Sequence, residues 1–471
     1  MYELNIPLRE GESPFYRQIY EFIVKEVRSG VLSPATRMPS TRVLAANLGV
    51  SRSTTQSAYD QLVSEGYLEA KPCKGYFIAD LEWMEGWQAD WEERGGNAPE
   101  GPSGPEIRSD WICDFSPRGV DVANFPYGVW RKLSREVLSE AKENLFNAGD
   151  SQGEKILREA LTVYLHSARG VNCDPGQIVV GAGSEYLLLL LSQFLPGRKQ
   201  IAMEDPTYKQ AYRVFERSGY EVRPVRMDDM GMDVRALRES EVGLAYVMPS
   251  HQYPTGIMMP IKRRMEVLSW AGESEDRYLI EDDYDSEFRY RGKPVPALQG
   301  VDREDNVIYI GTFSRSVAPA IRISYMVLPR KLLRFYHEKC DFYASTVSRV
   351  DQYILARFLR DGYFERHLNK MRKVYRAKHD ALLEELAPFF GAFDVSGENA
   401  GIHLLLTSKK GRSENWLTKR AEEEKIRVYG LSQSRIGKDE EETGTVLLGY
   451  ANRSIEEIRA GVSGLARAWL A

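Results

Sequence analysis

The stretch that decides the fold of this chain is Gly311-Thr312-Phe313-Ser314-Arg315-Ser316-Val317-Ala318-Pro319-Ala320-Ile321-Arg322. Apolar segments precede it at 307–310 and follow it at 323–328, so two predicted strands deliver small, hydroxyl and arginine side chains into one turn. Hydroxyl groups and backbone amides at a strand end, with a guanidinium close by, suit a phosphate or another small anion. A polar turn between two sheet strands would contain the same residue types, so the rest of the chain has to distinguish the two interpretations.

Strands and helices alternate from about Trp111 to the C-terminus. The hydrophobic pattern predicts strands and helices in turn at 178–180, 185–194, 243–248, 262–270 and 278–280. This order is typical of an α/β domain with a mostly parallel sheet. Ligands of such sheets bind at the carboxyl ends of the strands, where Gly183-Ser184 begins a helix and presents free amide groups to an anion.

Two further polar residues follow the predicted strand 278–280 at the same end of the sheet. Because side chains alternate along an extended chain, Asp282 and Tyr284 face one pocket and Asp283 faces away from it. With the turn around Arg315, this pocket offers an anion clamp, a carboxylate for a protonated ring nitrogen and a phenol for a ring oxygen. Tyr208 lies in a loop from which it could stack on such a ring. These groups together meet the needs of pyridoxal phosphate.

Residues 1–79 form a separate helical unit. The pattern predicts a helix from Ser13-Pro14 to Gly30, a second from Pro39-Ser40 to Gly49, and a third that Ser51 caps. In the third helix the residues that face inward follow the spacing i, i+3, i+4, i+7 and are Thr55, Ala58, Tyr59 and Leu62. The opposite face then carries Arg52, Ser53, Gln56 and Ser57.

Charge and turn residues in this unit favour contact with DNA. Between Glu26 and Asp60 the chain has four arginines and no acidic residue. Segments 66–70 and 76–78 predict two strands around the basic turn at 71–75, which would form a wing. Three short helices with a tight turn before the last describe a helix-turn-helix, whose exposed face reads base edges and phosphates. A helical subdomain with a solvated basic face is the alternative.

A change of composition separates the two units. Residues 80–110 contain nine acidic and two basic residues, and the Gly- and Pro-rich part at 95–105 is typical of a flexible linker. Trp83, Trp87 and Trp91 recur at helical spacing and predict a stripe that docks on a protein surface. We therefore divide the chain into a DNA-binding domain (1–79), a linker (80–110) and a larger domain (111–471).

Composition limits the remaining possibilities. The chain has 471 residues, of which 43% are hydrophobic and 28% charged, as in a globular protein, and its net charge of −5 excludes a globally basic protein. The four cysteines lack a paired metal spacing, and the N-terminus lacks a charged-then-apolar signal segment. The apolar run 187–191 is too short to span a bilayer. We expect a cytoplasmic protein without a metal site and without a membrane contact.

The N-terminal unit resembles the winged helix-turn-helix of GntR-type bacterial repressors. The resemblance rests on Gly30–Pro34, Met38-Pro39-Ser40-Thr41-Arg42, the run from Leu48 to Thr54, and Glu65-Gly66. It implies that Arg42 holds a phosphate, that Ser51 and Arg52 begin the recognition helix, and that Lys74-Gly75 form the tip of the wing. We expect DNA contacts from Arg42, Ser51, Arg52, Ser53, Gln56, Lys74 and Gly75.

The larger domain resembles the fold type I, aspartate-aminotransferase-like enzymes from about Asp114 onward. The motifs in the family order are Gly149-Asp150, Gly181–Ser184, Asp205-Pro206 with Tyr208, Pro249–Gly256, Asp282 with Tyr284, and the stretch 311–322. The resemblance implies that Asp282 pairs with the pyridine nitrogen of pyridoxal phosphate, Tyr284 with the ring hydroxyl, and that Tyr208 stacks on the ring. Ser184, Ser314 and Arg322 would hold the phosphate, and Gly183 and Thr312 complete the expected cofactor-binding set.

The combination of the two units resembles the MocR/GabR transcriptional regulators. It implies a homodimer that binds a double-stranded DNA operator and whose aminotransferase-like domain senses a small-molecule effector. Two alternatives remain open at this point. One is an active pyridoxal-phosphate-dependent aminotransferase with an accessory DNA-binding domain, and the other is a cofactor-free dimerisation scaffold.

The resemblance breaks at Arg315. The family pattern places here, between two serines, the lysine that forms the Schiff base with the cofactor. A guanidinium stays protonated near neutrality and offers no free amine, so we expect no catalytic residue, and a cofactor that is held non-covalently or has been lost. Gln210 and Gln433 stand where GabR-like members have arginines for ligand carboxylates, and Lys209 or Arg435 could compensate. Arg315 is either the natural residue of a degenerate sensor or an engineered replacement, and the sequence leaves both open.

Overall fold

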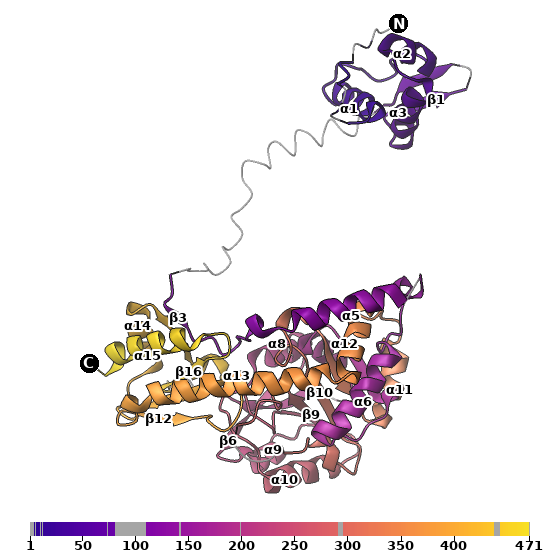
Figure 1. Cartoon of the computed structure of the whole chain (residues 1–471). Coiled ribbons are helices and arrows are strands. Elements are labelled where there is room, and N and C mark those ends of the chain that lie inside the picture. Colours follow the sequence, from indigo (N-terminus) through magenta and orange to yellow (C-terminus); the bar gives the residue numbers. More distant parts are fainter. Residues whose placement is uncertain are drawn as a thin grey trace. The chain divides into compact units, whose positions relative to one another are not determined.

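The chain folds into two compact units, residues Met1–Ile107 and Arg108–Ala471 (Figure 1). The structure is a computed structural model that describes residues 4–80 and 110–470, except for 5, 10, 12, 73, 141–142, 198, 291–294 and 438–442. The predicted linker at 80–110, with its stripe of Trp83, Trp87 and Trp91, lies outside the described residues apart from Asp80 and Asp110.

The smaller unit is a winged helix-turn-helix. Its elements are α1 (Phe15–Arg28), α2 (Thr41–Leu48), α3 (Arg52–Ser64) and the antiparallel hairpin of β1 (Leu68–Lys71) and β2 (Gly75–Ile78). The turn before α3 forms because Gly49 adopts a left-handed conformation (φ 66°) that ends α2. Ser51 then begins α3 by accepting a hydrogen bond from the backbone amide of Thr54 (3.1 Å).

The inner face of α3 is the one that its spacing predicts. Thr55, Ala58, Tyr59 and Leu62 are all buried, and the last three pack in one cluster with residues of α1 and the hairpin. Two polar groups of this face are bonded to the turn that starts α2, since the Tyr59 hydroxyl donates to the carbonyl of Pro39 (3.0 Å) and the Thr55 hydroxyl to that of Thr41 (2.9 Å). The apolar face therefore fixes α2 and α3 against each other.

The larger unit alternates helices and strands. Its helices are α5 (Tyr127–Glu140), α6 (Lys155–Arg169), α7 (Ser184–Phe194), α8 (Lys209–Arg217), α9 (Val234–Glu239), α10 (Ile261–Gly272), α11 (Arg330–Cys340), α12 (Arg349–Arg360), α13 (Tyr363–Glu385), α14 (Glu414–Glu423) and α15 (Ile455–Trp469). Its strands are β3 (Cys113–Asp114), β4 (Ile178–Gly181), β5 (Gln200–Asp205), β6 (Glu221–Asp228), β7 (Gly231–Met232), β8 (Leu244–Val247), β9 (Tyr278–Asp283), β10 (Val307–Thr312), β11 (Ser324–Val327), β12 (Phe393–Ser396), β13 (His403–Ser408), β14 (Ile426–Arg427), β15 (Tyr429–Gly430) and β16 (Thr445–Gly449). Within the described ranges, no helix is long and apolar enough to cross a membrane.

An eight-stranded sheet forms the centre of this unit, in the order β4-β11-β10-β9-β8-β5-β6-β7. The neighbours from β10 to β6 run parallel, whereas β11 is antiparallel to β10 and to β4. The predicted α/β fold with a mostly parallel sheet is therefore confirmed. A second sheet, β12-β13-β16-β15, packs with α14 and α15 around a core of its own (Figure 1).

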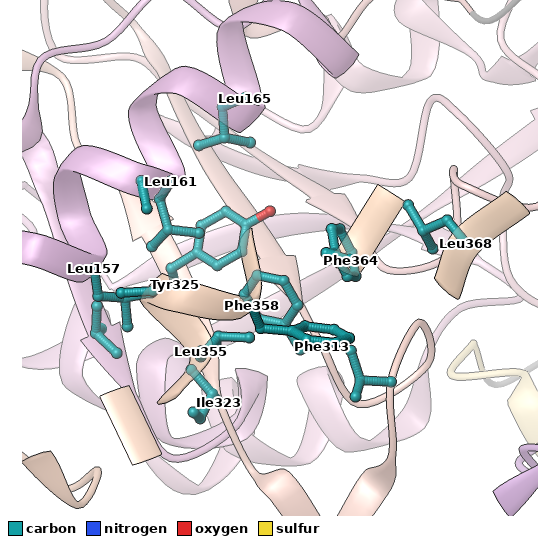
Figure 2. Packing of buried hydrophobic residues seen from close by; sticks show 14 of the residues in the cluster. Leu157, Leu161, Leu165, Phe313, Ile323, Tyr325, Leu355, Phe358, Phe364 and Leu368 are labelled. Carbon is teal, nitrogen blue, oxygen red and sulfur yellow. The ribbon is translucent and has the colours of Figure 1, made fainter. Parts of the chain in front are cut away.

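Helices cover both faces of the large sheet. Apolar side chains of each strand alternate between these two faces and pack against the helices on each. In β8, Leu244 and Tyr246 join a cluster with α7, α8 and α11, whereas Ala245 and Val247 join a cluster with α9 and α10. Under β4, β10 and β11 the second face is covered by α6, α12 and α13 instead (Figure 2). Burial on both faces explains why the strands are almost continuously apolar.

The stretch 311–322 is anchored in this last cluster. Figure 2 shows Phe313 and Ile323 among the leucines of α6 and the aromatic residues of α12 and α13. The ring of Phe313 lies edge-on to that of Phe364, with 5.4 Å between centroids, and its side chain is 1% exposed. Apolar packing against α6, α12 and α13 thus holds both ends of the polar stretch.

A buried ion pair joins α6 to the end of β9. The guanidinium of Arg169 donates through Nε to Asp283 (2.7 Å), and the hydroxyl of Tyr309 donates to the same carboxylate oxygen (2.6 Å). Both charged side chains are 5% exposed or less, so each is stabilised chiefly by the other.

We expect Arg169→Met to lower the free energy of unfolding of the larger unit by about 3–5 kcal/mol, because it leaves Asp283 as an unpaired buried charge. Guanidinium denaturation followed by circular dichroism measures this difference. The matched control is Arg330→Met, which removes an exposed partner of Asp174 (2.8 Å) and should leave the denaturation midpoint unchanged. An equal loss of stability in both variants would show that the buried Arg169 pair contributes no more than an exposed ion pair.

Candidate functional site

A cavity of about 260 Å³ opens at the carboxyl ends of the central strands. Among the predicted cofactor-binding residues, those that line it are Ser184, Tyr208, Asp282, Tyr284, Thr312, Ser314 and Arg322. Gly183 directly precedes Ser184 as the N-terminal cap of α7. The fold therefore brings together side chains that are more than a hundred residues apart in the sequence.

Asp282 lines this cavity from β9. Its Oδ2 accepts a hydrogen bond from the hydroxyl of Tyr246, and its Oδ1 is buried without a hydrogen-bond partner among the described residues. Burial raises the pKa of Asp282 to about 7, and the nearby carboxylates of Asp283 and Glu185 add to this effect. A cationic ring nitrogen beside Oδ1 would meet both its hydrogen-bonding need and its charge.

Tyr284 faces the same cavity from the residue after β9. Its hydroxyl lies 3.0 Å from Nδ1 of His251, and the same nitrogen lies 2.8 Å from Oδ2 of Asp285. Burial raises the pKa of Tyr284 well above its usual value, so the phenol is neutral and can donate a hydrogen bond. As the alternation predicted, Asp283 between the two points to the other face, where it meets Arg169.

One end of the cavity lies at the N-terminus of α7. Arg322 adopts a left-handed conformation (φ 52°), and its Nη2 donates to the carbonyl of Ala182 (3.0 Å). Gly183, with φ 99°, permits this approach, because a Cβ at position 183 would collide with the guanidinium. Free amides of the helix terminus and a guanidinium therefore converge beside Ser184.

Glu185 shares this end of the cavity with Arg322. Its Oε2 lies 3.4 Å from Nη2 of Arg322, and its Oε1 accepts a hydrogen bond from the hydroxyl of Tyr208 (2.8 Å). Burial works to raise the pKa of Glu185, but hydrogen bonds from its own backbone, Tyr208 and Arg322 outweigh burial and hold the pKa below its usual value. An ionised carboxylate thus competes with any anion for Arg322.

Arg315 also lines the cavity, and its Nη1 donates to the carbonyl of Pro117 (3.2 Å). No lysine is found among the described residues that line this space. Beside Arg315, the hydroxyl oxygen of Thr312 accepts hydrogen bonds from the amide of Ser314 (3.2 Å) and the hydroxyl of Ser324 (2.8 Å). The turn is therefore internally bonded, with a guanidinium at its centre.

The two glutamines noted in the sequence occupy different places. Gln210 lines the cavity, and with its amide oxygen turned toward Arg118 it accepts a hydrogen bond from Nη1 (3.0 Å). Gln433 and Lys209 line a neighbouring cavity instead. The ammonium of Lys209 donates to the carbonyl of Arg435 (2.5 Å), so this lysine is directed away from the cofactor cavity.

The predicted DNA-contacting residues lie on the exposed side of the smaller unit. Arg42 in the first turn of α2, and Arg52 and Ser53 in the first turn of α3, are all exposed. Lys74 and Gly75 form the turn of the hairpin, where the amide of Lys74 donates to the carbonyl of Lys71 (3.0 Å). Helix start and hairpin tip are the positions from which winged helix-turn-helix domains contact DNA.

Gln56 differs from its neighbours on α3. It is only partly exposed, because its Nε2 donates to Asp60 (2.7 Å) and to the hydroxyl of Tyr76 in β2 (3.2 Å). The side chain that helical spacing placed on an open face is therefore held between the recognition helix and the wing.

Sequence reasoning missed Tyr246, His251, Glu185 and Arg118 as members of the site. The sequence could have predicted Glu185 as a member of the site, since this residue directly follows Ser184 at the start of a predicted helix. Tyr246 and His251 do not line the cavity but hydrogen-bond Asp282 and Tyr284, which do. Tyr246 lies in a strand that looked merely apolar, and the motif Pro249–Gly256 gave no role to His251. Arg118 lies near the start of the domain, and nothing in its neighbours predicts a cavity.

Comparisons with known proteins agree with this architecture. The family "Aminotransferase class I and II" matches residues 121–465, and "Bacterial regulatory proteins, gntR family" matches residues 15–78. A similar protein is the HTH-type transcriptional regulator YdeL of Bacillus subtilis, 38% identical with 98% of each chain covered. The probable rhizopine catabolism regulatory protein MocR of Rhizobium meliloti is 31% identical over 98% of this chain and 95% of its own.

Solved structures extend the comparison to enzymes. The multiple substrate aminotransferase of Thermococcus profundus superposes with a TM-score of 0.69 at 27% identity, covering 77% of this chain and 92% of that one. Fold and matches together define a helix-turn-helix transcriptional regulator with an aminotransferase-like domain. The chain belongs to the aminotransferase class I and II family and, through its gntR-type domain and its full-length relatives, to the MocR-type DNA-binding regulators.

The aminotransferase fold implies a cofactor of the pyridoxal-phosphate type, and the cavity has groups that fit one. The free Oδ1 of Asp282 suits a protonated ring nitrogen. The N-terminus of α7, together with Ser184, Ser314 and Arg322, suits a phosphate.

We expect Glu185→Gln to tighten the binding of pyridoxal phosphate about tenfold, or about 1.4 kcal/mol, because it removes a negative charge and releases Arg322. Titration of the cofactor by absorbance and fluorescence quenching measures the dissociation constant. Glu159→Gln on the exposed side of α6 is the matched control and should leave the constant unchanged. Weaker binding by the Glu185 variant would mean that this carboxylate orients Arg322 rather than competing for it.

Proposed function

We propose that the aminotransferase-like unit is a sensor that holds pyridoxal phosphate without a covalent bond and controls DNA binding by the winged helix. The observation that carries this proposal is the position of Arg315 in a cavity whose described lining contains no lysine. When bound, the cofactor supplies a reactive carbonyl and an electron-accepting ring. Without an amine beside it, that carbonyl has no protein nucleophile to react with.

The remaining residues of the cavity retain binding and orienting roles. Asp282 would hold the ring nitrogen through Oδ1, since Oδ2 is already bonded to Tyr246. Tyr284 would donate to the ring oxygen, and Ser184, Ser314 and Arg322 would hold the phosphate with the amides of α7. Arg315 keeps its proton near neutrality, so it adds a positive charge beside the cofactor and cannot move a proton to or from it.

Control of transcription requires that a small-molecule effector bind one arrangement of the protein better than another. A homodimer would present two winged helices to an operator with two half-sites. Support for a dimer comes from the exposed side chains of Phe342 and Tyr343 just after α11, whose ring centroids are 4.2 Å apart. Such side chains in one region mark an association surface.

An active aminotransferase is the competing function, because the solved structures that are similar to this chain are enzymes of that class. Turnover of an amino acid with a keto acid by the purified chain, lost on removal of pyridoxal phosphate, would favour that alternative. The absence of a lysine from the described cavity lining argues against it.

We expect Arg315→Lys to restore covalent attachment of pyridoxal phosphate. After borohydride treatment, peptide mass spectrometry should find the reduced cofactor on residue 315 of the lysine variant, because a desolvated lysine reacts with the cofactor carbonyl. The native chain and the control Arg315→Gln should release all cofactor on denaturation. An adduct on another lysine of the native chain would show that the reactive centre lies elsewhere.

We expect Arg52→Ala to weaken operator binding by roughly 1–3 kcal/mol, because it removes a guanidinium from the start of the recognition helix. Fluorescence anisotropy with a duplex selected from random sequence by the native chain measures the affinity at fixed salt. The control Arg17→Ala alters an exposed arginine of α1 that is paired with Glu21 and is not a predicted DNA contact. Unchanged affinity of the Arg52 variant would contradict the recognition-helix assignment, and a stoichiometry of one chain per duplex would contradict the dimer.

A further inference from the structure

A second cavity, of about 610 Å³, adjoins the cofactor cavity. The two share Arg118, Gln210 and Tyr253 in their linings, so they are adjacent. We call the second one the outer cavity. None of the residues in the cofactor-binding set lines it, whereas Lys209 and the two glutamines at the positions of the carboxylate-binding arginines do.

The charge of the outer cavity is positive. Its lining contains four cationic side chains, Arg118, Lys209, Arg213 and Arg427, and no acidic residue from the part of the chain that the structure describes. Arg427 lies 3.9 Å from the carboxylate of Asp114, whereas no ion pair with a described residue is formed by Arg118, Lys209 or Arg213. At least three positive charges therefore line the outer cavity, and its described lining contains no negative charge that balances them.

Neutral hydrogen bonds hold two of these cations in place. Arg118 donates to the amide oxygen of Gln210 (3.0 Å), and Lys209 donates to the carbonyl of Arg435. The carbonyl of Pro117, next to Arg118, accepts a hydrogen bond from Arg315 (3.2 Å). These bonds orient the cationic groups but leave their charge unneutralised, which is the condition for strong binding of an anion.

Two of the cations lie in or close to the two-stranded sheet of β3 and β14. β3 pairs in parallel with β14, with Asp114 opposite Arg427, and Arg118 follows β3 closely. Lys209 and Arg213 come from α8 instead. A ligand that bridges these two groups would hold the segment at the start of the larger unit against α8.

We propose that the outer cavity binds a small polyanion with two or more carboxylate or phosphate groups, and that Arg118 and Arg213 are its main ligands. The proposal rests on the sensor function proposed above, since it gives the chemical class of the effector. The guanidinium groups form bidentate bonds with either kind of anion, and the volume of the cavity admits a molecule larger than a single ion. No amine on the effector is required, in agreement with an arginine at position 315.

The test uses the full chain, with citrate as the carboxylate probe and inorganic phosphate as the phosphate probe, in isothermal titration calorimetry at constant ionic strength. We expect one probe to bind the native chain in the millimolar range or tighter, and Arg118→Gln and Arg213→Gln each to weaken that binding at least tenfold. The probe that binds more tightly identifies the anionic group. Arg217→Gln, an exposed cation on α8 outside the cavity lining, is the matched control and should bind as the native chain does.

Two results would overturn the proposal: absence of binding of both probes up to 10 mM, or equal affinity in the native chain and both cavity variants. Cofactor absorbance is recorded for each variant in the same samples. Loss of anion binding with an unchanged cofactor titration assigns the effect to the outer cavity. Failure of the native chain to bind pyridoxal phosphate would contradict the sensor function itself, whatever the anion titration gives.

Discussion

The arrangement of the cofactor cavity depends on how the two ends of the segment between β10 and β11 are held in place. The amide of Phe313 donates to the carbonyl of Ile323 (3.0 Å), and both side chains are buried in the cluster formed with α6, α12 and α13. Because Phe313 and Ile323 are fixed in this cluster, the polar residues between them face the cavity. The position of Arg315 is therefore set by apolar packing against one helix earlier in the chain and two later ones.

Charge balance in the cofactor cavity follows from that arrangement. Three guanidinium groups and two carboxyl groups line it, and one of the carboxyl groups, Asp282, has a pKa of about 7. Positive charge is thus in excess near neutrality, and it remains in excess after the Glu185 and Arg322 side chains pair. In an enzyme of this fold a neutral amine would be needed at the centre, and here the same position adds a permanent cation. The cavity is consequently suited to an anionic ligand, while its described lining contains no lysine nucleophile.

Local periodicity was sufficient to predict most of the fold and half of the site. The helical spacing from Thr55 to Leu62 fixed the inner face of the recognition helix, and the strand alternation placed Asp282 and Tyr284 in one pocket. The partners of these residues could not be predicted in the same way. Tyr246 meets Asp282 across neighbouring strands, and Arg118 meets Gln210 from a distant segment, so both contacts depend on tertiary packing. Helical spacing also placed Gln56 on an open face, but the hydroxyl of Tyr76 in the hairpin partly covers its side chain.

The bond between Gln56 and Tyr76 has a consequence for the DNA sequences that this chain can read. One amide nitrogen joins the recognition helix to the hairpin, so the two elements form a single rigid body rather than two independent arms. A duplex that accepts the helix in its major groove must then offer its neighbouring backbone at the distance set by the hairpin. Groove width and local twist become part of the recognised signal, which adds selection by DNA shape to selection by bases.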